Sequence, residues 1–242
     1  MLKKIWKILI SFILFFFITT ILIVGIFRFL PIPTSSFMLQ QRISNIIDEN
    51  FEPIKYDWVD YSDISNSAKL AVIAAEDQKY FDHYGFDFES IEKALKRNKK
   101  SKITRGASTI SQQTAKNLFL WSDKSIVRKG FEVYFTLLIE TIWSKERILE
   151  VYLNIAEFGE NIYGVQSAAK KYFKRNSNQL TNQNAAMLAA VLPNPKKYKV
   201  NSLTNYKQRR VLWIQRQMRQ LGEGILEEKS NVKSEKLKIK KK

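Results

Sequence analysis

The sequence predicts a mostly α-helical protein in which one helical domain follows an N-terminal transmembrane helix. Three observations lead to this prediction. Residues 8–27 are uncharged and mostly apolar, residues 66–221 repeatedly place apolar side chains three and four positions apart, and no alternating run is long enough for a core sheet. About 215 residues follow the apolar run, which is enough for one compact domain.

The composition excludes several kinds of site. The chain has no cysteine, so it has no disulfide, thiol nucleophile or thiolate metal site. Its single histidine, His83, excludes a multi-histidine zinc site. The eight glycines form neither of the glycine-rich nucleotide-binding motifs. The 40 Lys and Arg residues against 23 Asp and Glu give a formal charge of +17, which predicts an anionic partner such as nucleic acid, acidic lipid or a phosphorylated substrate.

The apolar run 8–27 has the length of a membrane-spanning helix. At 1.5 Å per residue, twenty residues span about 30 Å, the thickness of the hydrocarbon core. Three lysines precede the run and only Arg28 follows closely, so residues 1–7 are expected in the cytoplasm. A cleaved signal peptide is the alternative, but its apolar region would be about 7–15 residues long. We therefore expect a single-pass anchor in the cytoplasmic (inner) membrane of a bacterium, with the domain outside (periplasmic) and no nucleic-acid partner.

The remaining chain divides into three parts. Residues 28–65 carry three prolines without sustained periodicity and are interpreted as a stalk or lead-in. Residues 66–225 form the expected domain. Residues 226–242 form a basic tail with the composition of a disordered segment.

Apolar periodicity and capping residues predict the helices of the domain. They are expected near residues 67–79, 126–142, 146–156, 165–173, 182–192 and 204–221. Thr181 is the expected N-cap of one helix, which Pro193 stops, and Gly222 ends the last.

Two adjacent carboxylates, Glu76 and Asp77, end the first of these helices, whose other residues are mostly apolar. Desolvation beside apolar surface raises the pKa of a carboxyl group, which suits a general acid or base near neutral pH. The alternative is that both carboxylates only solvate a helix end near Lys79.

Segment 105–117, RGASTISQQTAKN, is rich in hydrogen-bonding side chains. Such density suits binding to a sugar or phosphate, with Lys116 as a point charge. A turn with Ser108 as helix N-cap would explain part of the segment, but not the Gln112–Gln113 pair.

Segment 124–132, KSIVRKGFE, places Lys124, Arg128 and Glu132 four residues apart, near one helix face opposite the apolar stripe. The cations can hold a pyrophosphate, and Glu132 can orient them or assist catalysis. The alternative is a surface ion pair worth about 0.3–0.5 kcal/mol. His83 is expected to be a structural residue bonded to backbone.

In this order, the segments resemble the peptidoglycan glycosyltransferase family, and specifically its monofunctional biosynthetic members. The matching segments are EDQKYFDHYGFD (76–87), RGASTISQQTAKNLFLW (105–121), RKGFE (128–132), SKERILEVYLNIAEFG (144–159) and GVQSAAKKYF (164–173). The resemblance covers about residues 66–220. Tyr80 stands where the motif usually has Phe, and Ala107 replaces a common second Gly; neither change removes a reactive group.

The resemblance implies a single lysozyme-like helical domain that polymerises lipid II into β-1,4-linked glycan strands and releases undecaprenyl diphosphate. It gives Glu76 the position of the principal catalytic glutamate and Glu132 that of the second. The implied substrate-binding residues are Lys116, Lys124 and Arg128 for the diphosphate, and Ser108, Gln112, Gln113 and Asn117 on the donor side.

The resemblance also sets the expected partners, which are lipid II, the growing lipid-linked strand, the membrane, and other proteins of cell-wall synthesis or division. No cofactor is required by the sequence. It contains no D-x-D motif, so any Mg²⁺ or Mn²⁺ would arrive with the substrate diphosphate. Two alternatives stay open: a membrane-anchored, lysozyme-like enzyme that cleaves glycans, and a non-enzymatic cell-wall scaffold. The cation cluster favours synthesis, because a hydrolase has no diphosphate to bind.

Overall fold

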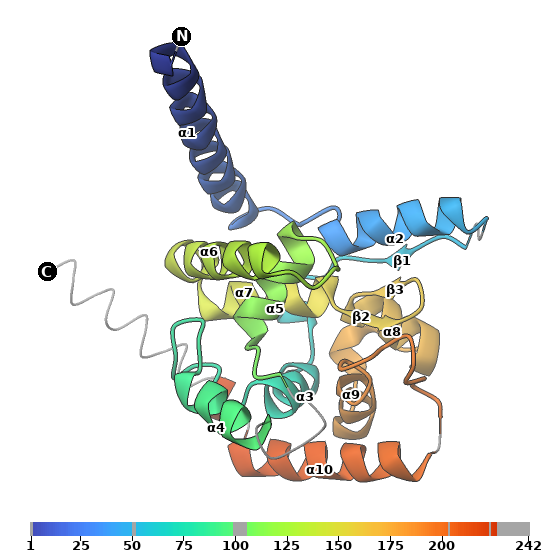
Figure 1. Cartoon of the computed structure of the whole chain (residues 1–242). Helices are drawn as coiled ribbons and strands as arrows, with labels where there is room; N and C mark the ends of the chain where they lie inside the picture. The colour runs from blue at the N-terminus through green and yellow to red at the C-terminus, as the bar shows by residue number, and fades with distance from the viewer. Residues whose placement is uncertain (1, 50–51, 99–105, 203, 223, 227–242) are drawn as a thin grey trace, which may run out of the picture.

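The computed structural model describes residues 2–49, 52–98, 106–202, 204–222 and 224–226 (Figure 1). Its elements are α1 (Leu2–Phe27), α2 (Ser36–Ile47), β1 (Lys55–Tyr56), η1 (Tyr61–Asp63), α3 (Asn66–Glu76), α4 (Phe88–Asn98), α5 (Ile110–Phe119), α6 (Ile126–Ile142), α7 (Lys145–Ile155), β2 (Glu157–Gly159), β3 (Ile162–Tyr163), α8 (Val165–Phe173), η2 (Ser177–Gln179), α9 (Asn182–Ala189) and α10 (Asn205–Leu221). The predicted mostly helical class is confirmed. The basic segment 227–242 lies outside the described residues.

Helix α1 projects from the body and is long and apolar enough to cross a membrane (Figure 1). Its C-terminal end is joined to the domain by hydrogen bonds. The indole Nε1 of Trp143 donates to the carbonyl oxygen of Val24 at 2.7 Å, and the guanidinium of Arg147 donates to that of Phe27 at 2.7 Å. These bonds fix where the domain lies relative to the predicted anchor.

The segment expected as a stalk, residues 28–65, contains structured parts of the domain. Helix α2 begins after Ser35, whose hydroxyl accepts a hydrogen bond from the Met38 N–H at 3.2 Å. Strand β1 pairs with β3, and the Asn45 amide donates to the Asn161 side chain at 2.9 Å. Periodicity missed this helix because α2 buries only Met38 and Asn45, too few positions to produce an apolar stripe.

The strands form one small sheet in the order β1-β3-β2. Strand β1 runs parallel to β3, and β2 runs antiparallel to it with an irregularity between Glu157 and Gly159. Strands of two or three residues are too short to show alternation in a sequence. The sheet matters for the site because it places Glu157 at the end of the central helix α7.

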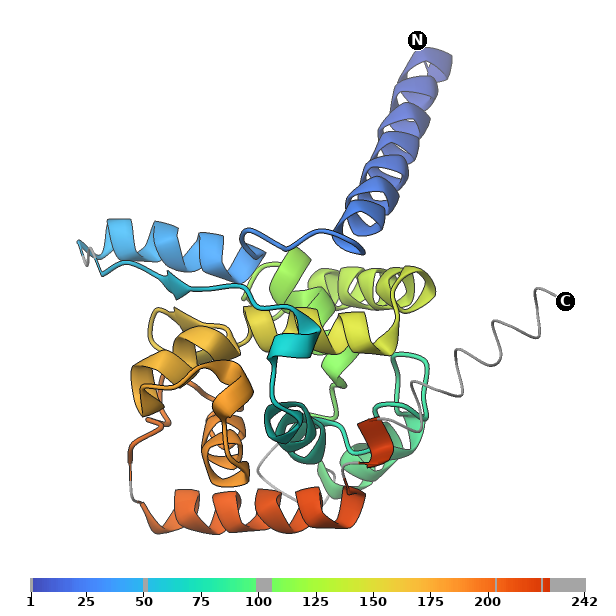
Figure 2. The ribbon, with the colours of Figure 1, turned by 180° about the vertical axis from the view of Figure 1, so that it is seen from behind.

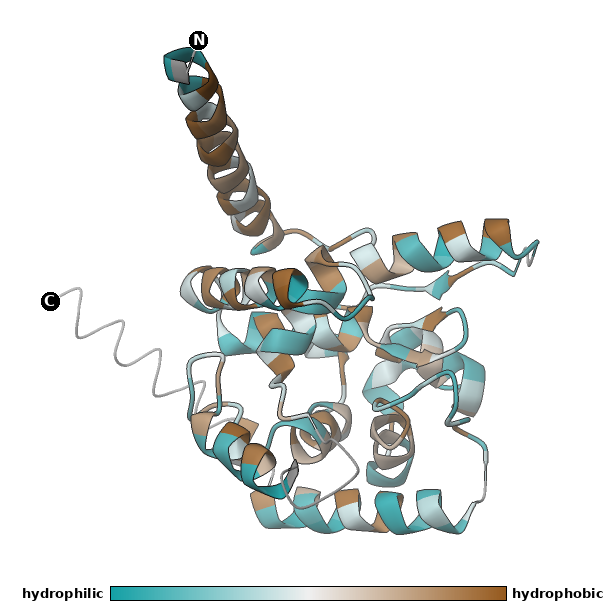
Figure 3. Ribbon diagram, viewed as in Figure 1, coloured by the Kyte–Doolittle hydropathy of each residue, from teal (hydrophilic) through white to brown (hydrophobic). Residues whose placement is uncertain are grey.

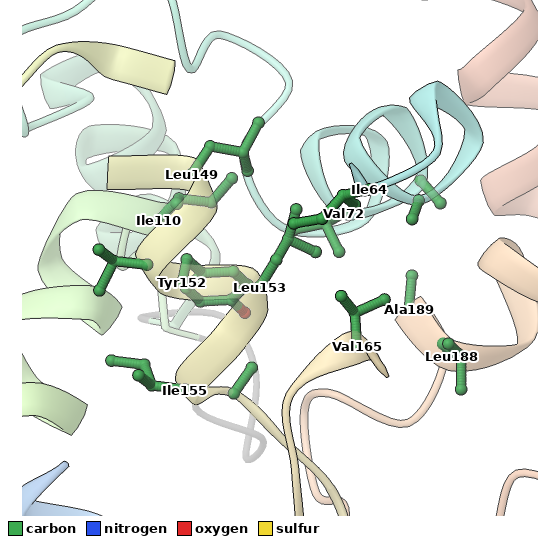
Figure 4. Packing of buried hydrophobic residues seen from close by; sticks show 14 of the residues in the cluster. Ile64, Val72, Ile110, Leu149, Tyr152, Leu153, Ile155, Val165, Leu188 and Ala189 are labelled. Carbon is green, nitrogen blue, oxygen red and sulfur yellow. The ribbon is translucent and has the colours of Figure 1, made fainter. Parts of the chain in front are cut away.

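Helix α7 forms the centre of the core, and its residues 148–155 are all buried. Figure 4 shows Leu149, Tyr152 and Leu153 from this helix packed with Ile110 of α5. A helix buried on all sides must satisfy its polar groups internally. Asn154 does so by donating its amide to the carbonyl oxygen of Val59 at 2.8 Å.

The other helices form two groups around this core. Helix α5 packs against α6 and α7, whereas α3 packs against α9 and α10. Helix α10 runs along the side of the body opposite α1 (Figures 1 and 2). The end of α3 and the start of α5 therefore meet between the two groups, and this is where Glu76 lies.

Helix α6 has the predicted bounds, but its burial differs from the prediction. The face that it buries carries Arg128 and Glu132, whereas Ile126 is 92% and Val127 is 65% exposed. Lys124 precedes the N-cap Ser125, so it lies off the helix face on which the sequence placed it. The buried face also carries Phe135 and Ile139, so it combines apolar packing with the ion pairs of Glu132, and Figure 3 shows that α6 is a helix of mixed hydropathy.

Capping corrects two helix boundaries. Helix α5 begins after Thr109, not Ser108: the Thr109 hydroxyl accepts from the Gln112 N–H, and the Gln112 side chain accepts from the Thr109 N–H. Thr181 caps α9 as predicted, but that helix ends at Ala189, before the predicted residue 192.

Candidate active site

Glu76 is the last residue of α3, and its carboxylate meets side chains from two other helices. One oxygen, Oε2, accepts a hydrogen bond from Gln113 Nε2 of α5 at 3.1 Å. The other, Oε1, lies 3.4 Å from Arg210 Nη2 of α10. Burial raises the pKa of Glu76, and the Gln113 hydrogen bond and the Arg210 charge oppose this without cancelling it. The geometry provides a partly buried carboxylate, whose side chain is 13% exposed, suited to taking up a proton.

Asp77 joins the end of α3 to the beginning of α5. Its Oδ2 accepts a hydrogen bond from the Ile110 N–H at 3.0 Å, and its Oδ1 lies 3.0 Å from Nε2 of His83. A carboxylate is well placed at a helix N-terminus, where N–H groups lack partners within the helix. His83 therefore has a structural role, but its partner is a carboxylate instead of backbone. These contacts of Asp77 hold the start of α5, the helix that carries Gln113, beside Glu76.

Glu132 is buried on α6 and holds two cations. Arg128 Nη1 lies 2.8 Å from Glu132 Oε2, and Lys129 Nζ lies 2.5 Å from Oε1. The Arg128 guanidinium is also buried, and its Nε has no hydrogen-bond partner among the described residues. Both carboxylate oxygens of Glu132 are thus occupied, while Arg128 keeps an unused donor.

Lys116 on α5 connects the two carboxylates electrostatically. Burial lowers the pKa of its ammonium group, and the charges of Glu132 and Glu76 both raise it. Arg128 and Lys129 act on it in the opposite direction. The structure therefore brings Glu76, Lys116, Arg128 and Glu132 into one electrostatic neighbourhood.

Two cavities flank this group. The larger, of about 490 Å³, is lined by Glu76 and Ser108. The smaller, of about 180 Å³, is lined by Gln113, Lys116 and Asn117. Because Gln113 is bonded to Glu76, the carboxylate stands between the two spaces.

The structure separates the other predicted site residues. Ser108 lines the larger cavity and not the one beside Lys116. Gln112 is buried, and its side-chain oxygen is engaged in the α5 capping box. Lys124 is exposed in the segment before α6.

Three site residues were not singled out from the sequence. Arg210 lies in a helix with several other cations, so nothing local distinguishes it. The Tyr152 hydroxyl donates to Gln113 Oε1 at 3.1 Å, and Glu157 lines the smaller cavity. Both lie within the motif at 144–159. The signal that could have identified them is a polar side chain within a mostly apolar stretch of that motif.

Comparisons with known proteins agree with this arrangement. The profile of a family described as Transglycosylase matches residues 41–219. The chain is 51% identical over 216 residues to a biosynthetic peptidoglycan transglycosylase of Mannheimia succiniciproducens, covering 89% of this chain and 88% of that protein. Proteins with the same description from Pasteurella multocida and Haemophilus influenzae are 54% and 52% identical, covering 84% and 93% of this chain and 83% and 91% of their own lengths.

Proposed function

This chain belongs to the transglycosylase family and is a glycosyltransferase that polymerises glycan strands in cell-wall synthesis. We propose that it acts on lipid II and that Glu76 is the general base. The observation that carries this assignment is the partly buried Glu76 carboxylate, held by Gln113 and within electrostatic reach of Lys116. A raised carboxyl pKa suits proton uptake near neutral pH.

The proposed reaction is one displacement. The 4-hydroxyl oxygen of the acceptor GlcNAc bonds to the anomeric carbon of a MurNAc unit, and the bond from that carbon to the undecaprenyl diphosphate oxygen breaks. The hydroxyl proton goes to Glu76. Attack opposite the leaving group converts an α linkage to β-1,4. The bound Gln113 amide keeps the carboxylate oriented toward the larger cavity, which we assign to the acceptor.

The leaving diphosphate needs positive charge. We assign this task to Lys116 and Arg128. Lys116 packs 5.4 Å from the centre of the Phe37 ring, and within the described part of the chain no carboxylate lies at ion-pair distance from it. Arg128 has the unused Nε donor. Glu132 orients Arg128 and does not act as a second base, because both of its oxygens already accept from cations. Lys124 contributes from the exposed rim.

A divalent ion is proposed to enter with the substrate diphosphate. The described residues include no group of three or more carboxylate or imidazole side chains arranged to hold a metal ion. The test is Mn²⁺ binding measured by electron paramagnetic resonance. We expect stoichiometric binding only when lipid II is present, and tight binding by the protein alone would contradict the proposal.

The membrane orientation is also a proposal. Helices α6 and α2 lie on the side of the body from which α1 projects (Figures 1 and 3), and both carry exposed apolar side chains, with Ile126 and Ile47 as examples. We propose that this side faces the outer surface of the bacterial cytoplasmic membrane and that the N-terminus is cytoplasmic. Lipid II would then present its diphosphate to Lys116 while its isoprenoid chain stays in the bilayer.

The absence of native cysteine makes this orientation testable. Lys4→Cys and Glu160→Cys place one thiol on each side of the predicted anchor. A membrane-impermeant maleimide should label the Glu160→Cys protein in intact spheroplasts and the Lys4→Cys protein only after lysis. The reverse pattern would refute the orientation.

The test of the catalytic assignment is polymerisation of lipid II by the full-length protein in detergent, with product sizing. Loss of general-base catalysis typically costs about 10²–10⁴ in rate, so Glu76→Gln should be nearly inactive while its thermal unfolding shows a folded protein. Glu160→Gln, at an exposed position, is the control. Near-normal polymerisation by Glu76→Gln would refute the role of Glu76, and release of fragments from preformed peptidoglycan would indicate cleavage.

A further inference from the structure

Two residues that line the smaller cavity each carry a buried side-chain oxygen atom without a hydrogen-bond partner among the described residues. One is Oε1 of Glu157, at the start of β2, and the other is Oδ1 of Asn117, on α5. Both residues line the same space of about 180 Å³, together with Lys116 and Tyr152. The reaction scheme above uses neither oxygen.

Unpartnered buried acceptors are costly. Leaving one buried polar group without a hydrogen bond costs about 1–3 kcal/mol, so native proteins rarely keep two in one place without a use. Because both atoms are acceptors, an occupant of this cavity satisfies them only by donating hydrogen bonds. The volume corresponds to about six water molecules, which suits one sugar ring or its side group and not a folded peptide.

We propose that Glu157 is a specificity-determining residue of the saccharide site beside Lys116, where it accepts a hydrogen bond from a hydroxyl or amide N–H of the sugar. This inference rests on the proposed use of lipid II. The sugar bonded to the diphosphate must lie near the cations that hold the diphosphate, and Lys116 lines this cavity. Asn117 and Glu157, from α5 and β2, would then bind the same sugar.

The electrostatics of Glu157 agree with this role. Burial raises its pKa to about 7, with Lys196 lowering it and Glu160 raising it. A donated hydrogen bond stabilises the charged form of a carboxyl group. Sugar binding and ionisation of Glu157 therefore favour each other near neutral pH.

The experiment compares steady-state kinetics on lipid II for the full-length wild type, Glu157→Ala, Glu157→Gln and Glu160→Ala. A hydrogen bond to a charged group contributes about 1.5–3 kcal/mol, so Glu157→Ala should raise KM about tenfold or more with little change in kcat. Glu157→Gln keeps one carbonyl acceptor and should recover part of the loss. Glu160→Ala, which removes an exposed carboxylate on the same turn, should not raise KM, because loss of its charge only favours the ionised form of Glu157.

A second measurement uses lipid II analogues that lack single donor groups on the MurNAc ring or its N-acetyl group. One analogue should lose affinity for the wild type but not for Glu157→Ala, which a merely structural role would not produce. The inference is overturned if Glu157→Ala and Glu160→Ala have the same KM, or if every analogue affects both proteins equally. Failure of the wild type to polymerise lipid II would instead refute the proposed function. Thermal unfolding of each variant verifies that it is folded. If Glu157→Ala does not fold, the comparison uses Glu157→Gln in its place.

Discussion

The guanidinium of Arg210 lies 3.4 Å from the carboxylate of Glu76, although the two residues are 134 positions apart. The contact exists because α10 packs against α3, at whose end Glu76 lies. Burial and Arg210 act on the pKa of Glu76 in opposite directions, with burial the larger. The last helix of the domain thus adjusts the group proposed as the base.

Arg210→Ala should move the acidic limb of the rate profile to higher pH. Removing the cation raises the pKa of Glu76 further, so a larger share of the enzyme carries a protonated, inactive base at a given pH. We expect a several-fold loss of kcat/KM at about pH 6 and a smaller loss at about pH 8.5. The measurement is lipid II polymerisation across this range. Arg209→Ala, at the exposed neighbouring position, is the control, and a uniform loss at every pH would contradict the prediction.

Glu132→Gln should destabilise the fold as well as reduce activity. It removes the charge that neutralises Arg128, whose side chain is only 11% exposed. Breaking a buried ion pair from one side costs about 3–5 kcal/mol, because it leaves an uncompensated charge. Chemical denaturation in detergent measures this loss. Glu89→Gln, which affects only the exposed ion pairs with Lys79 and Lys93, should leave the unfolding free energy unchanged. A fully stable but inactive Glu132→Gln protein would instead indicate a direct catalytic role.

Lys116→Ala should reduce turnover much more than Lys124→Ala. Lys116 is partly buried and near enough to Glu132 and Glu76 for their charges to act on its pKa, and partial burial strengthens its interaction with a diphosphate. Lys124 is exposed, so water and salt screen its charge. We expect at least about a hundredfold loss of kcat/KM for Lys116→Ala, comparable to losing one oxyanion-stabilising donor, and less than tenfold for Lys124→Ala. Equal effects would show that the two lysines share the diphosphate.

Glu157→Gln should make stability less dependent on pH. The pKa of Glu157 is about 7 in the fold against an ordinary value of 4.5, so the unfolded chain releases its proton first as pH rises. The wild type therefore loses stability between about pH 4.5 and 7, by up to about 3 kcal/mol, and stays at the lower level above that range. The variant lacks this loss, so it should equal the wild type near pH 4 and exceed it near pH 8. Thermal unfolding at both pH values checks this, and identical pH dependence would contradict it.

Features of the fold that depend on neighbouring residues in the chain could be predicted from the sequence. The predicted anchor followed from twenty consecutive uncharged and mostly apolar residues, and the bounds of α6 and α8 followed from periodicity. Helix α2 was missed because only two of its residues are buried. Ser108 was taken for the α5 cap because several residues in that segment can accept a hydrogen bond, and only the backbone path selects Thr109.

The sequence by itself thus determined that this protein is a helical domain with an N-terminal helix long and apolar enough to cross a membrane, and with carboxylates and cations in ordered motifs. Tertiary packing decided which of those groups meet. It brought Arg210 to Glu76, turned the charged face of α6 inward, and placed Glu157 and Asn117 in the lining of one cavity. The physical reason is that side-chain spacing along a helix depends on nearby residues, whereas a contact between helices depends on how distant segments bury their surfaces together.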